Sequence, residues 1–171
     1  TCQDASTVDN DGTLNGGASI ASSGCAKGSC LYLDGTNDYL QTSKTIRTVL
    51  GGEDYAGPIT ISVWVKPTGY RTNDTHTIYR GVENSGASLD IFLATNNVPY
   101  PKVRAFIRHS SPEEADMPIP ADSGWYHIVF LVSNFGKGAS SVNKIYINGI
   151  LQETQTVATN TTHDIPNYVS Y

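Results

Sequence analysis

The sequence is poor in charge and has no long apolar run. Only 16 % of its 171 residues are charged, and the formal net charge is −5. Nucleic-acid binding usually needs a basic surface that displaces phosphate counterions, so this balance argues against a nucleic-acid partner. No apolar stretch approaches the roughly 18 residues that cross a bilayer, so membrane insertion is not expected.

The sequence has a single methionine. No signal peptide is recognisable, so we expect a mature form or a domain cut from a longer protein. The chain instead contains 16 glycines, 8 prolines and 10 tyrosines. Low charge with many glycine, tyrosine and small polar residues favours an extracellular all-β protein. The length suffices for one domain with a substantial core, which we expect to span residues 1–171.

The three cysteines indicate an oxidising compartment. Cys25 and Cys30 sit in a short loop, residues 24–30, that contains two glycines, and a disulfide there would hold the loop with a modest entropic gain. Two thiolates without a nearby histidine make a poor zinc site. Cys2 is left to bond one of this pair, another chain or a segment outside this sequence. Asn73 and Asn160 begin N-glycosylation triplets, which fits an extracellular location.

Alternation of apolar and polar residues predicts strands along most of the chain. The clearest covers residues 59–65, where isoleucine and valine occupy one face and Thr60, Ser62 and Trp64 the other, until Pro67 ends it. Further strands are predicted at 18–22, 30–34, 76–82, 88–95, 101–109, 125–133, 143–148 and 151–157.

Turn residues separate these strands. Asp34-Gly35 predicts a hairpin turn after the strand at 30–34, and Asn148-Gly149 predicts a two-residue hairpin. A helical turn within 43–50 would end at Gly51, while the proline-rich and acidic segment 110–124 is predicted to be a loop. Because no amphipathic helix of three turns is visible, the pattern indicates a sandwich or barrel.

Four blocks of sequence, in order, carry a family resemblance. They are Gly12 to Gly17; Leu31 to Gly35 with Asp38-Tyr39; Ile59 to Pro67; and Trp125 to Val129 with Lys144 to Gly149. With these blocks the chain resembles the laminin-G-like jelly roll of the concanavalin A-like lectin/glucanase superfamily. The resemblance implies an all-β fold, a two-sheet antiparallel β-sandwich or jelly roll.

The chain departs from the family at its end. Members usually close with a final strand beside the N-terminal one, whereas this sequence stops at residues 167–171. An uncovered apolar edge promotes association. We therefore expect the final strand to lie outside this stretch of chain or to be supplied by a neighbouring chain.

Nothing in the sequence favours catalysis. Glycosidases of the superfamily project paired carboxylates from alternate positions of one strand, because acid and base must flank one bond. The acidic residues Glu113, Glu114 and Asp116 lack that spacing and are interpreted as solvated loop charges. The histidines are scattered and no nucleophile elbow is present, so we expect no enzyme.

Two aspartates are candidate calcium ligands. Asp34 and Asp38 bracket a turn whose carbonyls offer further oxygens, and many relatives carry one structural calcium at a sheet edge. Asp9 and Asp11 would lie nearby if the N-terminal segment packs as in the family. The alternative is that Asp34 and Asp38 only make the hydrogen bonds that turns favour.

Basic residues on two strands form a candidate ligand face. Arg80 lies on the strand at 76–82, and Arg104 and Arg108 share one face of the strand at 101–109. If the two strands are neighbours, the arginines offer bidentate donors to the sulfate or carboxylate groups of a glycan. The preferred alternative is an ordinary solvated sheet face.

The tyrosines near loops are candidate sugar-stacking residues. Tyr70, Tyr79 and Tyr100 fit this role because stacking needs an exposed ring. Trp64 and Trp125 stand where the family commonly has tryptophan, so the resemblance favours core packing for both. For Trp64, core packing disagrees with the strand alternation, which places its side chain on the face opposite the isoleucines and valines.

These features favour a non-catalytic adhesion or carbohydrate-binding module of a secreted or cell-surface protein, whose partner is a glycan or a cell-surface protein. The alternative is a structural subunit of an extracellular filament or surface layer, assembled through edge-strand contacts.

Overall fold

The structure is a computed structural model, and it describes residues 1–52, 55, 57–68, 75–82, 88–94, 102–108, 115–118, 124–134 and 140–157. Strands dominate the described chain. They are β1 (Gly12–Asn15), β2 (Ser19–Ala21), β3 (Cys30–Tyr32), β4 (Tyr39–Thr42), β5 (Ile59–Val65), β6 (Thr75–Val82), β7 (Ser88–Ala94), β8 (Lys102–Arg108), β9 (Ala115–Pro118), β10 (Tyr126–Val132), β11 (Ser141–Ile147) and β12 (Ile150–Val157).

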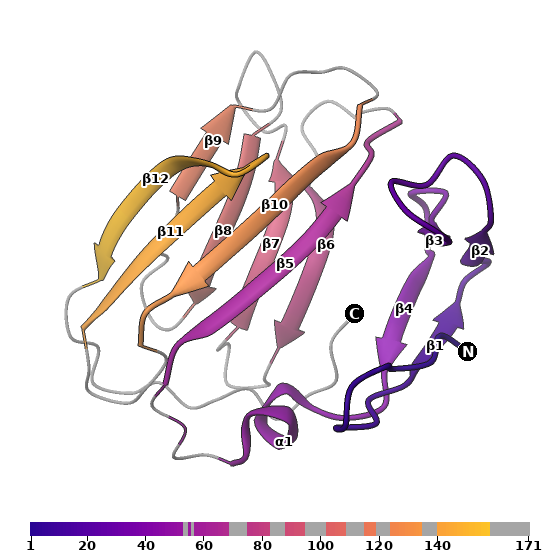
Figure 1. Ribbon diagram of the computed structural model, residues 1–171, viewed down its shortest axis with the longest axis horizontal. Coiled ribbons are helices and arrows are strands. Elements are labelled where there is room, and N and C mark those ends of the chain that lie inside the picture. Colours follow the sequence, from indigo (N-terminus) through magenta and orange to yellow (C-terminus); the bar gives the residue numbers. More distant parts are fainter. Residues whose placement is uncertain are drawn as a thin grey trace.

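Two four-stranded antiparallel sheets face each other (Figure 1). One has the strand order β12-β11-β10-β5, and the other has the order β6-β7-β8-β9. The chain leaves the first sheet after β5, forms the whole second sheet, and returns to pair β10 with β5. This arrangement is the predicted antiparallel β-sandwich of the jelly-roll type.

The core lies between the inner faces of the two sheets. On β10 and β11 every second residue is buried, which is the pattern expected where one face of a sheet packs and the other meets solvent. The largest fully buried side chains are Phe130, Ile128, Ile145, Val103 and Val132. On β5 the predicted face, which ends with Val65, packs against this core.

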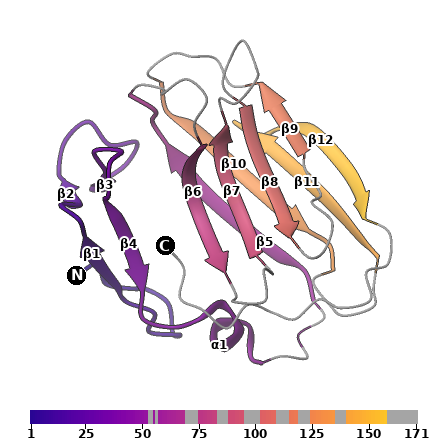
Figure 2. The same cartoon turned by 180° about the vertical axis from the view of Figure 1, so that it is seen from behind.

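The N-terminal hairpin, residues 12–42, lies beside the edge strands β5 and β6 (Figures 1 and 2). Its strands pair β1 with β4 and β2 with β3, so it is one long hairpin that is interrupted in the middle. The predicted hairpin around Asp34-Gly35 is wrong, because the strands on either side of that turn pair with β2 and β1 rather than with each other.

Close backbone packing explains the two glycines at the interruption. At Gly16, where φ is +77°, a Cβ would lie 2.1 Å from the carbonyl oxygen of Asn37. At Gly17, φ is +142° and a Cβ would lie 3.1 Å from Oδ1 of Asp38. A side chain does not fit at Gly16, and the positive φ of Gly17 disfavours one there, so the Asn15-Gly16-Gly17 block of the sequence has a structural basis.

The remaining turns mostly follow the sequence. Asn148 and Gly149 both have positive φ and join β11 to β12, as the hairpin signal predicts. The helical turn is α1 (Ile46–Leu50), capped by Thr45 and ended by Gly51 in the left-handed conformation. Within the described chain, no helix is long and apolar enough to cross a membrane.

One predicted loop contains a strand. The segment 110–124 includes β9, which pairs with β8 and places Asp116 opposite Arg104. The strand was not predicted because proline and acidic residues are uncommon in strands, although both are tolerated at a sheet edge. The prediction about the final strand concerns the end of the chain and lies outside the described residues.

Candidate ligand-binding site

A long groove separates the N-terminal hairpin from the sandwich. It consists of two hollows, of about 240 and 310 Å³, which share the lining residues Leu31, Leu33, Thr77 and Ile78. One wall is therefore formed by β3 and the turn after it, and the opposite wall by β6. The larger hollow also reaches the end of β5.

Three aromatic residues line the larger hollow, which we call the aromatic groove. Tyr32 comes from β3, Trp64 from β5, and Trp125 from the residue before β10. Tyr32 and Trp64 are 56 % and 54 % exposed. Single exposed aromatic side chains are ordinary on a protein surface, whereas several of them around one hollow are typical of a binding surface.

Trp64 is held in place from one side. Its indole stacks on the imidazole of His127, with the ring centroids 4.8 Å apart and the planes at 17°. The imidazole Nε2 is 2.8 Å from the hydroxyl oxygen of Ser62, and the backbone N–H of His127 donates to Oδ1 of Asn148 at 2.9 Å. The indole therefore loses little conformational freedom when a ligand contacts it.

Trp125 ties the hairpin to the sandwich. Its Nε1–H donates to the carbonyl oxygen of Gly24 at 3.1 Å, across 101 positions of sequence. Gly24 precedes the disulfide between Cys25 and Cys30, which is present as the short loop suggested and closes the tip of the hairpin. The tip of the hairpin is thus fixed at the end of the groove.

A lysine and a histidine accompany these aromatics. Lys66 follows β5 directly, and His76 lies on β6, so they stand on different wall elements. Among the described residues that line the aromatic groove, none is aspartate or glutamate.

The sequence indicated only part of this site. The core packing that the family resemblance favoured for Trp64 is wrong. Trp64 is exposed and faces outward, as the strand alternation suggested. Trp125 is half-buried and carries the hydrogen bond to the hairpin. The prediction that Tyr79 is an exposed stacking residue near a loop is also wrong. Tyr79 lies on β6 and is partly buried against the core. Tyr70 and Tyr100 lie outside the described residues.

The strands that carry the predicted arginines are not adjacent. β6 and β8 are not neighbours, because β7 lies between them. Asp90 of β7 is the register partner of Arg80, and Asp116 of β9 is the register partner of Arg104. Arg108 pairs with the backbone of β7 at Ser88. Two of the three arginines thus have an acidic register partner, and sulfate or carboxylate binding by the three arginines stays a prediction.

The aspartates of the predicted calcium site form an Asx turn. Oδ1 of Asp34 accepts from the N–H of Thr36 at 2.8 Å, and Oδ2 of Asp38 accepts from the N–H of Asp34 at 2.9 Å. Oδ1 of Asp38 is buried with no hydrogen-bond partner, which fits one metal-ligand oxygen. Calcium takes six to eight oxygens, however, and the described residues gather no group of three metal-ligating side chains. One structural calcium at this turn stays a prediction.

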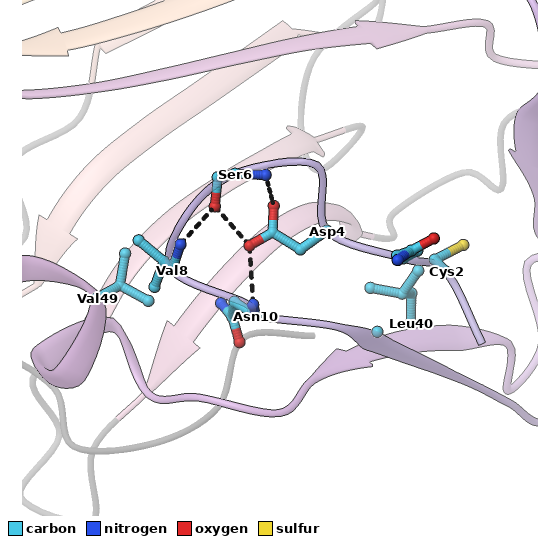
Figure 3. Close-up of a pocket in the computed structure, with 9 residues that line it drawn as sticks. Cys2, Asp4, Ser6, Val8, Asn10, Leu40 and Val49 are labelled. Atoms are coloured by element: carbon cyan, nitrogen blue, oxygen red, sulfur yellow. Dashed lines mark hydrogen bonds between the residues drawn. The ribbon is translucent and has the colours of Figure 1, made fainter.

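A further hollow, of about 360 Å³, lies at the N-terminal loop (Figure 3). Asp4 organises this loop, because its carboxylate accepts from the hydroxyl of Ser6 and from the N–H groups of Ser6 and Asn10. These hydrogen bonds, the one from the Ser6 hydroxyl foremost, lower the pKa of Asp4 to about 2. Oδ1 of Asp11 accepts from the N–H of Asp4 in the same loop.

Cys2 borders the same hollow and is not disulfide-bonded. Its backbone pairs with Gly12 through two hydrogen bonds of 2.8 Å. The carboxylate and backbone groups of this loop bond to one another, so we assign the loop a structural role. The glycosylation candidates Asn73 and Asn160 lie outside the described residues, as do Glu113 and Glu114.

Comparisons with known proteins agree with this architecture. Curated protein sequences give no match. Among solved structures, the chain is similar to the binding domain of botulinum neurotoxin DC in complex with rat synaptotagmin II, with a TM-score of 0.72 and 15 % identity. That match covers 99 % of this chain but 40 % of the other, and at this identity it shows the fold alone. A family model described as "Concanavalin A-like lectin/glucanases superfamily" matches residues 34–169. The chain therefore belongs to the concanavalin A-like lectin/glucanase superfamily, in its laminin-G-like family.

Proposed function

We propose that this chain is a non-catalytic carbohydrate-recognition module of a secreted or cell-surface protein, and that it binds sugars in the aromatic groove. The observation that carries the proposal is the meeting of Tyr32, Trp64 and Trp125 around one hollow of about 310 Å³. This volume lies at the lower end of the range of about 300–1,000 Å³ that is typical of small-ligand sites. A sugar presents an apolar ring face, which stacks on an aromatic ring, and hydroxyl groups, which bond to polar residues at the rim.

The state of Trp64 supports this use. An indole that already stacks on His127 offers a flat apolar platform with little entropy left to lose on binding. Its partner His127 is fixed in turn by Ser62 and Asn148. Because 54 % of Trp64 remains exposed, a ligand gains contact area without first opening the groove.

The chemistry of the lining supports binding rather than hydrolysis. Glycoside hydrolysis needs a pair of carboxyl groups on either side of the scissile bond. The described residues that line the aromatic groove include no carboxylate. The disulfide between Cys25 and Cys30 at the hairpin tip supports an extracellular or cell-surface location.

Screening the protein against a glycan array, followed by calorimetry on the sugars that bind, tests the proposal. We expect Trp64→Ala to weaken binding by about tenfold or more, as truncation of a central tryptophan usually does. Leu151→Ala is the matched control, because it removes an exposed apolar side chain from β12, at the other edge of the same sheet. Sugar binding that is equally strong in wild type and Trp64→Ala contradicts the proposal.

Self-association through a sheet edge is the second candidate. Within the described residues β5 pairs with β10 alone, so its outer side is an edge. In that case the sedimentation coefficient rises with protein concentration, and Thr60→Lys on β5 abolishes the rise because a charge on an edge strand opposes pairing. A concentration-independent sedimentation coefficient removes this candidate.

A further inference from the structure

We propose that the aromatic groove selects acidic glycans, and that Lys66 supplies the positive charge that recognises their carboxylate or sulfate groups. The inference rests on the proposed carbohydrate binding and goes beyond it by naming the ligand class. It also moves the basic contact from the predicted arginines of β6 and β8 to a residue that directly follows β5.

The distribution of charge carries the argument. The protein has 16 aspartate and glutamate residues but only 11 lysine and arginine residues, so a lining drawn at random would more often contain a carboxylate than a lysine or arginine. The described lining of the aromatic groove shows the opposite, because it contains Lys66 and neither aspartate nor glutamate. A hollow with a lysine and no acidic residue attracts an anion, while the negative charge elsewhere disfavours anion binding on the remaining surface.

The position of Lys66 adds a geometric reason. It comes two residues after Trp64 and directly before Pro67. Pro67 also lines the groove and prevents the strand from continuing. Lys66 and Trp64 thus lie on the same segment and both line the groove. A sugar ring on Trp64 would carry its acidic substituent within reach of a neighbouring cation, so stacking and charge recognition would act on one residue of a glycan.

Lysine suits this role better than a paired arginine would. An ammonium is a point charge, and its N–H donors are not fixed in one plane as those of a guanidinium are. It can therefore donate to a carboxylate or a sulfate in several orientations. Lys66 is also exposed, and its charge is therefore partly screened by salt. We expect the aromatic residues to supply most of the affinity and Lys66 to supply the preference for acidic over neutral sugars.

Three oligosaccharides separate the possible ligands. The first is an oligogalacturonate, the second is its carboxyl-reduced form, which is neutral but otherwise matched, and the third is a heparin oligosaccharide. Calorimetry at low and moderate salt gives the affinity for each. Preference for the first identifies a carboxylate ligand, and preference for the third identifies a sulfate ligand. Either preference, when it depends on Lys66, supports the inference.

We expect Lys66→Ala to weaken binding of the preferred acidic oligosaccharide by about tenfold and to leave the neutral form unchanged, because a charge-assisted hydrogen bond is lost. Lys144→Ala is the matched control: it removes the same charge from β11, away from the groove lining. Lys66→Arg should retain most of the affinity. Unchanged circular dichroism spectra and melting temperatures confirm that each variant is folded.

The outcomes are distinguishable. If acidic and neutral oligosaccharides bind equally and Lys66→Ala has no effect, while Trp64→Ala still abolishes binding, then the proposed function stands and the charge inference is wrong. If none of the three oligosaccharides binds, the charge inference is wrong, and the glycan array then decides whether the proposed function also fails. If no sugar binds and the protein instead forms dimers that Tyr32→Ala or Trp64→Ala dissociates, the groove is assigned to a second copy of the chain, which also overturns the inference.

Discussion

The sandwich and the N-terminal hairpin are held together in different ways. On β10 every second side chain is buried, whereas all three residues of β3 remain at least partly exposed. The sandwich therefore gains its stability from apolar burial between two sheets. The hairpin relies on local constraints, which are the disulfide between Cys25 and Cys30, the close packing at Gly16, and the hydrogen bond from Trp125. A groove formed between a rigid body and such a hairpin depends on those few contacts.

The largest effect should come from a cavity in the sandwich. Phe130 is 1 % exposed, and Phe130→Ala should lower the free energy of unfolding by about 3–5 kcal/mol. Leu33→Ala, in the hairpin wall and 41 % exposed, is the control and should cost under about 1 kcal/mol. Urea unfolding followed by tryptophan fluorescence measures both. Equal losses would mean that the two regions do not differ in the way described.

The second effect should come from the hairpin's backbone packing. Gly16→Ala places a Cβ 2.1 Å from the carbonyl oxygen of Asn37 and should destabilise the hairpin by about 2–3 kcal/mol. Gly35→Ala is the matched control, since its φ of +78° is nearly the same but no atom lies within 4 Å of the added Cβ. It should cost about 1–2 kcal/mol, for the left-handed backbone alone.

Amide hydrogen exchange measures where each alanine acts. We expect Gly16→Ala to speed exchange in β1 to β4 while protection in β10 and β11 is unchanged, because the hairpin shares few described contacts with the core. A uniform loss of protection in both regions would show that the hairpin and the sandwich unfold as one unit.

A smaller effect is expected at the link between the regions. Trp125→Phe keeps an aromatic ring but removes the hydrogen bond to Gly24, and should cost about 1 kcal/mol. It should also weaken sugar binding, because the hairpin wall is then less firmly placed against β5. Hydrogen exchange at residues 21–32 measures the first effect and calorimetry the second. Unchanged exchange there would mean that this bond does not hold the hairpin.

The fold was largely predictable because its sandwich strands alternate. The strand at 59–65 coincides with β5, and Asn148-Gly149 makes the predicted turn. The family resemblance added the architecture. Pairing partners were harder, because a turn signal such as Asp34-Gly35 shows where the chain reverses but not which strand it then joins. β9 was missed because its pairing with β8, rather than its own composition, makes it a strand.

The candidate site was mostly not predictable. Its aromatic residues come from β3, β5 and the segment before β10, which only the folded chain brings together. Trp64 alone carried a signal, since alternation along 59–65 placed it outside the core. The arginines were a plausible cluster in sequence, but the intervening β7 separates their strands, and no sequence pattern revealed that order.

The smallest effect concerns the N-terminal loop, which the charged carboxylate of Asp4 holds together through hydrogen bonds. The hydrogen bonds that Asp4 accepts lower its pKa to about 2, below the value of about 3.9 expected in an unfolded chain. A lowered pKa means that the loop is stabilised fully above pH 4, and that this contribution is lost as the pH falls through 2. The amide resonances of Ser6 and Asn10 should therefore titrate with a midpoint near pH 2, while those of β10 do not move with that midpoint. Asp4→Asn should abolish the transition, and a midpoint near 4 would mean that these bonds do not hold the loop in solution.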